Sequence, residues 1–283
     1  MDRRGTIRVF LLPGLGNKLF QYVFARLLAE HHGMKLKHDG IKEFGIKKPK
    51  CKGDKNLPTI RFKAREKREK DWWSIWNNKN FFKNNYKIYG YFEDYLFYKP
   101  HLSKIRSWFK ETSITNYEDV VFHLRIGDRL FDKNFIESTV NPGRCFDVFK
   151  KIRYRKIVIV TDLKQWDIIN ESDLGNLKKL CHSSKTINKD RIILNIRYAN
   201  QIIKSLSSLN PIIHSKSDST IEDFNYIRSF DKIVFTNSTF AWWAATLSKA
   251  SSIGVYEYWR KYKGDDRNKN LGLTDYPGWY SWK

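Results

Sequence analysis

Short apolar runs alternate with amphipathic stretches along much of the chain. Residues 6–12 form an apolar run typical of a buried strand, and a turn with two glycines follows. Apolar side chains then recur at helical spacing from Leu19 to Leu28, which predicts a helix that begins at Asn17 and ends near Gly33. The chain therefore opens with a predicted βα unit, whose glycines let the backbone approach another group closely.

The second half of the chain repeats this alternation more regularly. We predict buried strands at residues 120–125, 156–161, 211–214 and 232–236, and helices at residues 163–170, 173–181, 198–209, 221–230 and 239–250. Strands that alternate with helices are joined by right-handed crossovers and form a mainly parallel sheet. We therefore expect an α/β fold.

The length of 283 residues exceeds the usual size of one hydrophobic core, so two domains are expected. Residues 42–70 are rich in lysine and predict a loop followed by a solvated helix, and the regular alternation starts near residue 116. We predict an N-terminal α/β domain over residues 1–115 and a C-terminal Rossmann-like domain over residues 116–283.

A formal net charge of +23 would attract phosphates, nucleic acids or anionic membrane surfaces. The alternative is that most of the lysines, which occur throughout the chain, are simply solvated. Cys51, Cys145 and Cys181 form no Cys-x-x-Cys pair, and their odd number argues against a disulfide framework. The apolar run of residues 6–12, which follows the basic residues near the N-terminus, is too short for the core of a signal peptide. No stretch approaches the ~20 apolar residues of a membrane span. We expect a cytoplasmic protein, with peripheral contact to an anionic membrane as an option that the charge allows.

Polar residues follow the predicted strands at the edge where open α/β sheets bind ligands. They are Gly14, Gly16 and Asn17, residues 123–128, Thr161 and Asp162, residues 214–216, and residues 236–239. Arg125 would follow an internal strand, and arginine is seldom buried without a partner. Its planar guanidinium suits a diphosphate, and an ion pair with Asp128 is the competing explanation.

Asn237, Ser238 and Thr239 precede a predicted helix whose first residues are apolar. The free N–H groups at a helix N-terminus bind phosphate, and the hydroxyls add donors. An ordinary Ser or Thr N-cap is the alternative. The same three residues form a glycosylation sequon, which we discount because no secretion signal is evident.

Four segments resemble the motifs of the α-1,2-fucosyltransferases, in that family's order and near its spacing. Residues 14–22 (GLGNKLFQY) resemble the opening GLGNQLFQY motif, and residues 90–93 (GYFE) resemble GYFQ. Residues 123–128 (HLRIGD) resemble HVRRGD, and residues 236–247 (TNSTFAWWAATL) are similar to SNSSFSWWGAxL. Together the four segments are highly specific, although none would be convincing alone.

The resemblance implies a GT-B-like fold of two Rossmann-type domains with the donor between them. It implies an inverting glycosyltransferase, similar to a galactoside 2-α-L-fucosyltransferase, with GDP-fucose as donor and a glycan as acceptor. The residues it marks for the donor are Gly14, Gly16, Asn17, Arg125, Asp223, Asn237, Ser238 and Thr239. Arg125 would bind the β-phosphate. Asp223 would recognise the guanine base, and the alternative is that it is only a carboxylate that interacts favourably with the dipole at its helix N-terminus. Asp128 is the preferred base for the acceptor hydroxyl, with His123 either a second candidate or a packed strand residue.

Two departures from the family pattern concern charge. Lys18 stands where the family has glutamine, and Ile126 replaces the second of the paired arginines. These two changes indicate either specificity for a different sugar or acceptor, or neutral sequence drift.

No metal or other cofactor is expected, because the Asp-x-Asp pair of metal-dependent transferases is absent from the sequence. Asp265 and Asp266 lie in a polar segment that predicts a solvated turn, and Cys181 with His182 has no second ligand pair at suitable spacing.

Two other classes of protein are alternatives to a transferase. A dinucleotide-binding fingerprint would need glycine where Phe20 stands, and its acidic residue could only be Asp39; a P-loop is excluded by spacing. A nucleic-acid-binding protein would suit the charge and the aromatic residues. Against that class, Trp242 and Trp243 predict a buried helix face, and the basic residues are spread along the whole chain.

Overall fold

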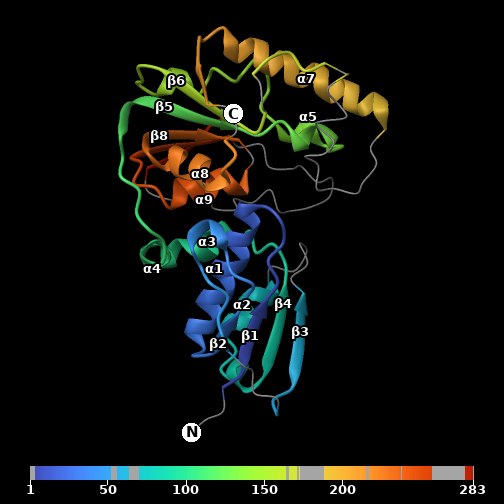
Figure 1. Cartoon of the computed structure of the whole chain (residues 1–283), viewed down its shortest axis with the longest axis vertical. Coiled ribbons are helices and arrows are strands. Elements are labelled where there is room, and N and C mark those ends of the chain that lie inside the picture. The colour runs from blue at the N-terminus through green and yellow to red at the C-terminus, as the bar shows by residue number, and fades with distance from the viewer. Residues whose placement is uncertain are drawn as a thin grey trace. The chain divides into compact units, whose positions relative to one another are not determined.

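The computed structural model describes residues 4–51, 56–63, 70–163, 166–170, 172, 188–214, 217–236, 238–256 and 278–282. The chain divides into two compact units, Met1–Asp94 and Tyr95–Lys283, and each contains one wholly parallel sheet (Figure 1). The expected α/β class is confirmed. Within the described residues, no helix has the length and apolar character that crossing a membrane requires.

The first unit is built on a four-stranded sheet of order β2-β1-β4-β3. Its elements are β1 (Thr6–Val9), α1 (Leu15–His31), β2 (Lys35–Lys37), η1 (Lys42–Phe44), β3 (Thr59–Lys63), α2 (Lys70–Trp76), η2 (Phe81–Lys83) and β4 (Asn85–Tyr89). Helix α1 packs its apolar side against this sheet and buries Leu19, Phe20 and Phe24 completely. The βα unit at the start of the chain is therefore confirmed, with the helix beginning two residues before Asn17.

Strand β3 corrects the prediction of a loop and a solvated helix over residues 42–70. Five residues of β3 pair in parallel with β4, from Thr59 beside Asn85 to Lys63 beside Tyr89. The strand sequence TIRFK alternates polar and apolar residues over only five positions, and Ile60 stays 42% exposed, so this edge strand lacks the continuous apolar run of the buried strands. Pairing with β4, which is distant in sequence, creates the strand.

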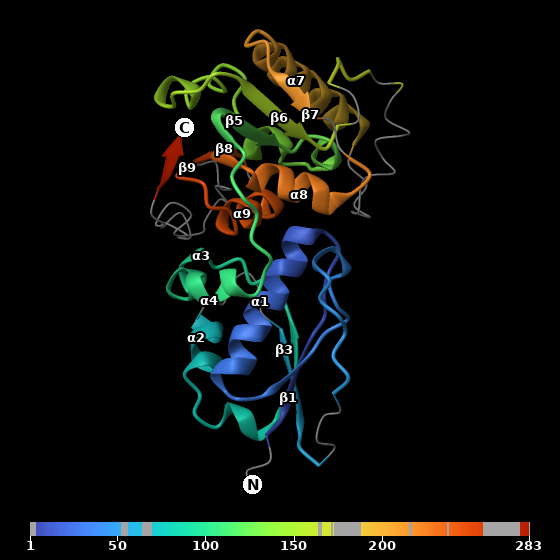
Figure 2. The same cartoon turned by 60° about the vertical axis from the view of Figure 1, so that its left-hand side comes forward.

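The second unit is built on a six-stranded sheet of order β10-β9-β8-β5-β6-β7. Its strands are β5 (Asn116–Leu124), β6 (Ile157–Thr161), β7 (Ile212–His214), β8 (Phe230–Phe235), β9 (Ser252–Tyr256) and β10 (Trp279–Trp282). Its helices are α3 (Tyr95–Tyr98), η3 (Lys99–His101), α4 (Leu102–Ser107), η4 (Asp128–Phe131), α5 (Phe135–Ser138), η5 (Phe149–Lys151), α7 (Lys189–Ser207), α8 (Thr220–Arg228) and α9 (Thr239–Thr246). Helix α7 covers one face of the sheet, and α8 and α9 cover the other (Figures 1 and 2).

The four strands predicted in this half are confirmed as β5, β6, β7 and β8. The prediction of a helix at residues 163–170 is wrong. The structure describes residues 163 and 166–170 of this segment, and none of them is helical. The Ile169 N–H donates to Asn200 Oδ1 at 2.9 Å, and Asn200 Nδ2 donates to the Ile169 carbonyl at 3.0 Å. This side chain on α7 thus binds the backbone groups that a helix would have used. The helix predicted at residues 173–181 lies outside the described residues.

The segment 95–115 packs within the second unit, whereas the sequence suggested a boundary at residue 116. The Tyr95 ring lies 4.8 Å from Trp242, and Arg106 Nε donates to the Thr246 carbonyl at 2.8 Å. The buried Arg228 donates to the Lys110 carbonyl at 2.9 Å, and burial lowers the pKa of this guanidinium to about 10. Aromatic burial and a satisfied buried arginine therefore join this segment to α8 and α9.

Candidate functional site

The carboxyl ends of parallel strands meet at one edge of the second unit's sheet. Strand β5 pairs with β6 on one side and with β8 on the other, so it is an internal strand, as predicted. Arg125 follows its last residue, and Asp162 follows the end of β6. The polar groups named from the sequence at the ends of β5 and β6 thus share one sheet edge.

Arg125 and Asp128 form a two-pronged ion pair at the end of β5. Arg125 Nε lies 2.8 Å from Asp128 Oδ1, and Nη2 lies 2.5 Å from Oδ2. The structure therefore contains the ion pair that was the competing explanation for Arg125. The pair uses two of the five N–H donors of the guanidinium, and 36% of the Arg125 side chain is exposed. The fixed and partly exposed fork still suits an anion.

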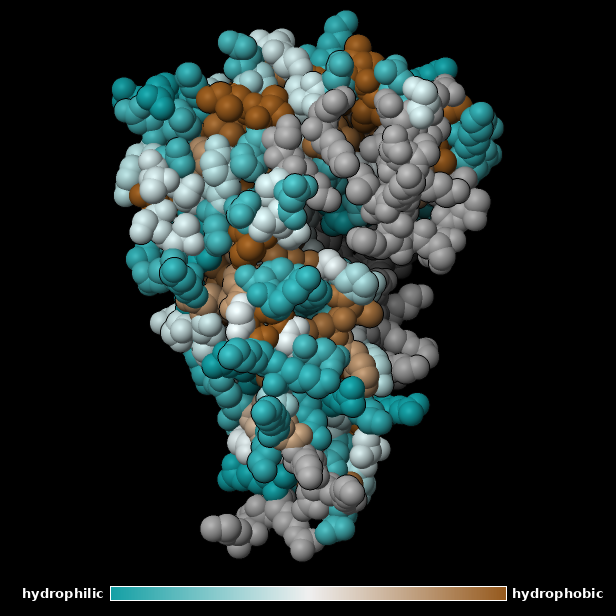
Figure 3. Space-filling model, viewed as in Figure 1, coloured by the Kyte–Doolittle hydropathy of each residue, from teal (hydrophilic) through white to brown (hydrophobic). Residues whose placement is uncertain are grey.

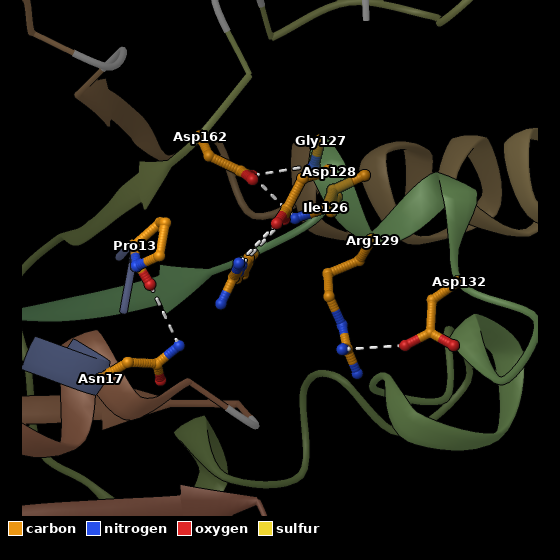
Figure 4. A network of polar contacts seen from close by, with 9 residues as sticks. Pro13, Asn17, Ile126, Gly127, Asp128, Arg129, Asp132 and Asp162 are labelled. Carbon is orange, nitrogen blue, oxygen red and sulfur yellow. Dashed lines mark hydrogen bonds and ion pairs between the residues drawn. The ribbon is translucent and has the colours of Figure 1, made fainter. Parts of the chain in front are cut away.

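Asp162 holds the backbone of this motif, a role that the sequence did not predict. Its Oδ1 accepts N–H groups from Ile126 at 2.8 Å and from Gly127 at 2.9 Å (Figure 4). Burial raises the pKa of Asp162, although the two N–H donors act in the opposite direction. A Cβ on Gly127 would lie 3.1 Å from Asp162 Oδ2, so the motif glycine makes room for this carboxylate. The only sequence signal was the position of Asp162 at a strand end.

His123 is a packed residue of β5. It is buried against the Phe240 ring at 5.6 Å, and its Nδ1 has no hydrogen-bond partner among the described residues. Burial, assisted by the nearby charge of Arg125, lowers the pKa of His123 to about 3. An imidazole with such a low proton affinity is a poor general base, which argues against the catalytic alternative for this residue.

Ser238 is the N-cap of α9. Its Oγ accepts the Ala241 N–H at 3.3 Å, and its side chain is buried. The ordinary N-cap proposed as an alternative is therefore present. Thr239 is the first residue of the helix, where backbone N–H groups lack intrahelical partners and attract anions. Asn237 lies outside the described residues.

Asp223 lies in the first turn of α8 and is buried. Its Oδ1 lies 3.0 Å from His214 Nε2, at the end of β7, and accepts the Ser217 N–H at 3.2 Å. The His214 ring stacks on Tyr226 with centroids 4.0 Å apart. A histidine and an aromatic ring therefore accompany this carboxylate, a grouping that the sequence did not reveal. Residues 215 and 216 lie outside the described residues.

The glycine turn in the first unit has a backbone that only glycine adopts readily. Gly14 has φ 89° and ψ 123°, and its carbonyl accepts the Lys18 N–H at 3.0 Å. Asn17 Nδ2 donates to the Pro13 carbonyl at 3.3 Å (Figure 4), and Gly16 is buried in the first turn of α1. The turn places Asn17 at a helix N-terminus, as predicted.

Gln21, in the motif of residues 14–22, is hydrogen-bonded to the motif of residues 90–93. The sequence did not predict this contact. Gln21 is fully buried, its Oε1 accepts the Leu12 N–H at 2.7 Å, and its Nε2 donates to the Gly90 carbonyl at 2.9 Å. The Phe24 ring stacks on Phe92 with centroids 4.2 Å apart. A glutamine on an otherwise apolar helix face was the available signal.

Among the described residues, no group of three or more His, Cys, Asp and Glu side chains is arranged to hold a metal ion. Cys181 with His182, and Asp265 with Asp266, lie outside that part of the chain. The arrangement described here offers cationic and N–H donors, which suit an anionic ligand.

Residues 191–276 match the family model of glycosyl transferase family 11. No curated protein sequence is similar enough to the chain to count as a match. The family resemblance is therefore confirmed for the last of the four motif segments, residues 236–247, which lies in this region together with β8, α9 and β9.

Several solved structures are similar to the chain at low identity. A mutant of Arabidopsis thaliana FUT1 in complex with GDP is 11% identical, with a TM-score of 0.45, 93% of this chain covered and 71% of the other. The fucosyltransferase NodZ from Bradyrhizobium is 11% identical, with a TM-score of 0.40 and coverages of 89% and 96%. The E. coli glycosyltransferase TibC is 9% identical, with a TM-score of 0.40 and coverages of 90% and 59%. At these scores, the likenesses do not define the activity of this chain.

Proposed function

We propose, from the glycosyl transferase family 11 signature of residues 191–276, that the protein transfers L-fucose from GDP-fucose to a hydroxyl of a glycan. We further propose inversion at the sugar carbon, and an activity like that of the galactoside 2-α-L-fucosyltransferases. The single observation that carries the proposal is the match of this region to the family, and the motif residues at one sheet edge add to it.

In this proposal the fold is GT-B-like, and each of its two Rossmann-type domains supplies donor-binding residues. Arg125 binds the β-phosphate, and Ser238 and Thr239 bind phosphate at the N-terminus of α9. Asp223 reads the guanine, and Asn17 contacts the fucose or its phosphate from the N-terminal domain. The assignments of Asn17, Arg125, Ser238 and Thr239 rest on the matched motifs and on the hydrogen-bond donors that these residues present. The assignment of Asp223 rests on its position in the first turn of α8 and on its carboxylate, which accepts hydrogen bonds.

The leaving diphosphate gains negative charge as the glycosidic bond breaks, so a preorganised cation gives the largest assistance. The ion pair with Asp128 holds the Arg125 guanidinium in one orientation before the donor arrives. We propose that donor phosphate replaces Asp128 as the partner of Arg125. The released carboxylate then accepts the proton of the acceptor hydroxyl.

A donor screen tests the proposal. Nucleoside diphosphate release would be followed with GDP-fucose, GDP-mannose and UDP-galactose, each with and without a galactoside acceptor. We expect release from GDP-fucose to exceed release from the others, and to increase when acceptor is added. Preference for another nucleotide sugar would favour the second candidate, a transferase of different donor specificity, which the Lys18 and Ile126 departures suggest. Release from none of the donors would contradict both.

A further inference from the structure

A shallow depression of about 610 Å³ lies within the first unit, beside the motif helix α1. The charged residues that line it are Lys18, Asp39, Lys42, Glu43, Lys47 and Lys48. Lys18 comes from the first turn of α1, and the others come from the loop around η1. None of the donor-binding assignments above uses this depression.

The loop that forms the depression is tightly constructed. Ile41 is fully buried, and its N–H and carbonyl pair with those of Ile46 at 2.8 and 3.1 Å. Gly40 has φ +88°, and a Cβ there would lie 2.8 Å from the Ile46 carbonyl oxygen. A Cβ on Gly45 would have nothing within 4 Å, so this glycine leaves its side of the loop open. The loop therefore presents its lysines on a fixed backbone.

An ion pair joins this loop to the motif helix. Lys18 Nζ lies 2.9 Å from Glu43 Oε1, and the two side chains are only 27% and 16% exposed. Burial alone would raise the pKa of Glu43, but the hydrogen bond and charge of Lys18 bring it below its ordinary value. Lys18 stands where the opening motif of the family has glutamine, so the Lys18–Glu43 ion pair depends on a residue that differs from the family pattern.

The lining charges do not balance. Four lysines face two carboxylates, and each carboxylate already has a lysine partner, since Lys48 Nζ lies 3.2 Å from Asp39 Oδ1. Lys42 and Lys47 are exposed, and the ion pairs of this loop among the described residues use Lys18 and Lys48 instead. The charge of Lys42 also helps to lower the pKa of Glu43, without a direct ion pair. Two ammonium groups on one loop therefore raise the local concentration of anions.

We infer that this depression binds the anionic group of an acidic saccharide, a carboxylate or phosphate carried by the acceptor glycan. Lys42 and Lys47 contact the anion, while the Lys18–Glu43 pair keeps the loop against α1. Describing the ligand as an acceptor rests on the proposed function; the anion site itself does not.

The first test is lysine footprinting, which needs no enzymatic activity. Acetylation of Lys42 and Lys47 would be measured by mass spectrometry with a disaccharide ending in glucuronic acid and with the matching disaccharide ending in glucose. We expect the acidic sugar, and not the neutral one, to protect both lysines. The exposed Lys79 and Lys83 of the same unit are internal controls. Equal protection of the controls, or protection by both sugars, would overturn the inference.

The second test is kinetic and compares acceptors with and without a carboxylate. In Lys42→Gln/Lys47→Gln, the acceptor KM should rise roughly 5- to 10-fold for the acidic acceptor only, about the effect of two partly solvated charge contacts. The KM for the donor should not change. Lys79→Gln/Lys83→Gln removes the same charge elsewhere and should have no such effect; an equal rise in this variant would attribute the result to net charge. If no nucleotide sugar is consumed at all, the proposed function fails and the footprint still decides the anion site.

Discussion

Arg125 illustrates how one residue can satisfy two interpretations of its sequence position. Its guanidinium is held by Asp128 in a two-pronged ion pair and yet remains partly exposed. The planar fork matches a carboxylate and a phosphate equally well, so the contact with Asp128 also holds the guanidinium in an orientation that suits an anion.

Arg125→Lys keeps the positive charge and loses the fork. We expect transfer to fall by roughly 10²-fold or more, by analogy with the loss of one transition-state donor. Initial rates of GDP release measure this change. Arg129→Lys is the matched control, because Arg129 also pairs with an aspartate three residues later, Asp132 at 2.9 Å. Near-normal turnover by Arg125→Lys would remove Arg125 from the mechanism.

Gly127 and Asp162 should be energetically coupled. In Gly127→Ala the new Cβ would crowd Asp162 Oδ2 and disturb the hydrogen bonds that hold the motif backbone. The φ of −49° at Gly127 suits alanine, so crowding and not backbone strain would cause the loss. Asp162→Asn keeps an Oδ1 acceptor for both N–H groups and serves as the conservative control.

A double-mutant cycle of Gly127→Ala with Asp162→Ala, followed by urea unfolding and by GDP release, measures the coupling. We expect a coupling energy of about 0.5–3 kcal/mol, because the crowding disappears when Asp162 is truncated. Additive effects of the two substitutions on both stability and rate would show that Gly127 and Asp162 are not coupled.

At the scale of elements, the N-terminus of α9 carries a side-chain cap and is also where we propose that phosphate binds. The Ser238 Oγ satisfies one backbone donor, that of Ala241, and the other donors of the first turn point beyond the helix end. The phosphate binding that we propose would therefore use N–H groups other than the one that the cap occupies, and a substitution can separate the two.

Ser238→Asp should preserve the cap and repel phosphate, because aspartate is a strong N-cap residue and carries a charge. We expect GDP affinity to fall about 10-fold or more, the effect of one charge contact of roughly 1.4 kcal/mol. Calorimetric titration with GDP and a melting curve measure the two effects. Ser238→Asn has nearly the same size without the charge, so an equal loss in this variant would indicate crowding and contradict the phosphate assignment.

At the scale of the whole molecule, the charge of +23 dominates any experiment with a polyanion. Hydrophilic side chains are distributed over both units on the face drawn in Figure 3 and do not form a single stripe. Nonspecific stabilisation by nucleotides is therefore the effect against which specific binding must be measured.

GDP should stabilise the protein more than UDP, which has the same diphosphate and a different base. A ligand at a hundredfold excess over its Kd adds about 2.7 kcal/mol, which corresponds to a Tm increase of roughly 5–10 °C for a protein of this size. The larger shift with GDP should persist in moderate salt, which screens surface charge. Equal shifts would leave only nonspecific electrostatics, and no shift with either would count against a nucleotide-sugar site.

Transfer should proceed without a divalent metal, because the proposed charge stabilisation comes from Arg125 and the α9 N-terminus. Excess EDTA should therefore leave the rate nearly unchanged. Restoration by Mn²⁺ or Mg²⁺ of a rate lost in EDTA would show that a metal supplies this charge.

The sequence by itself determined the features that depend on local pattern. Apolar runs marked β5, β6 and β8, which are buried on both faces, and helical spacing marked α1. The order of these elements implied a parallel sheet. The positions of the strand ends then indicated Arg125 and the N-terminus of α9 as candidate phosphate-binding groups. Such features follow from periodicities of a few residues, so one chain is enough to predict them.

Only the tertiary structure decided the features that depend on distant partners. Edge strand β3 exists because it pairs with β4, and the segment 95–115 packs with the second unit because its aromatic rings meet Trp242. Gln21 and Asp162 acquire their roles from backbone N–H groups and carbonyls brought to them from elsewhere in the chain. A single polar residue has no periodicity, and its partner is fixed only when the fold satisfies each buried donor and acceptor.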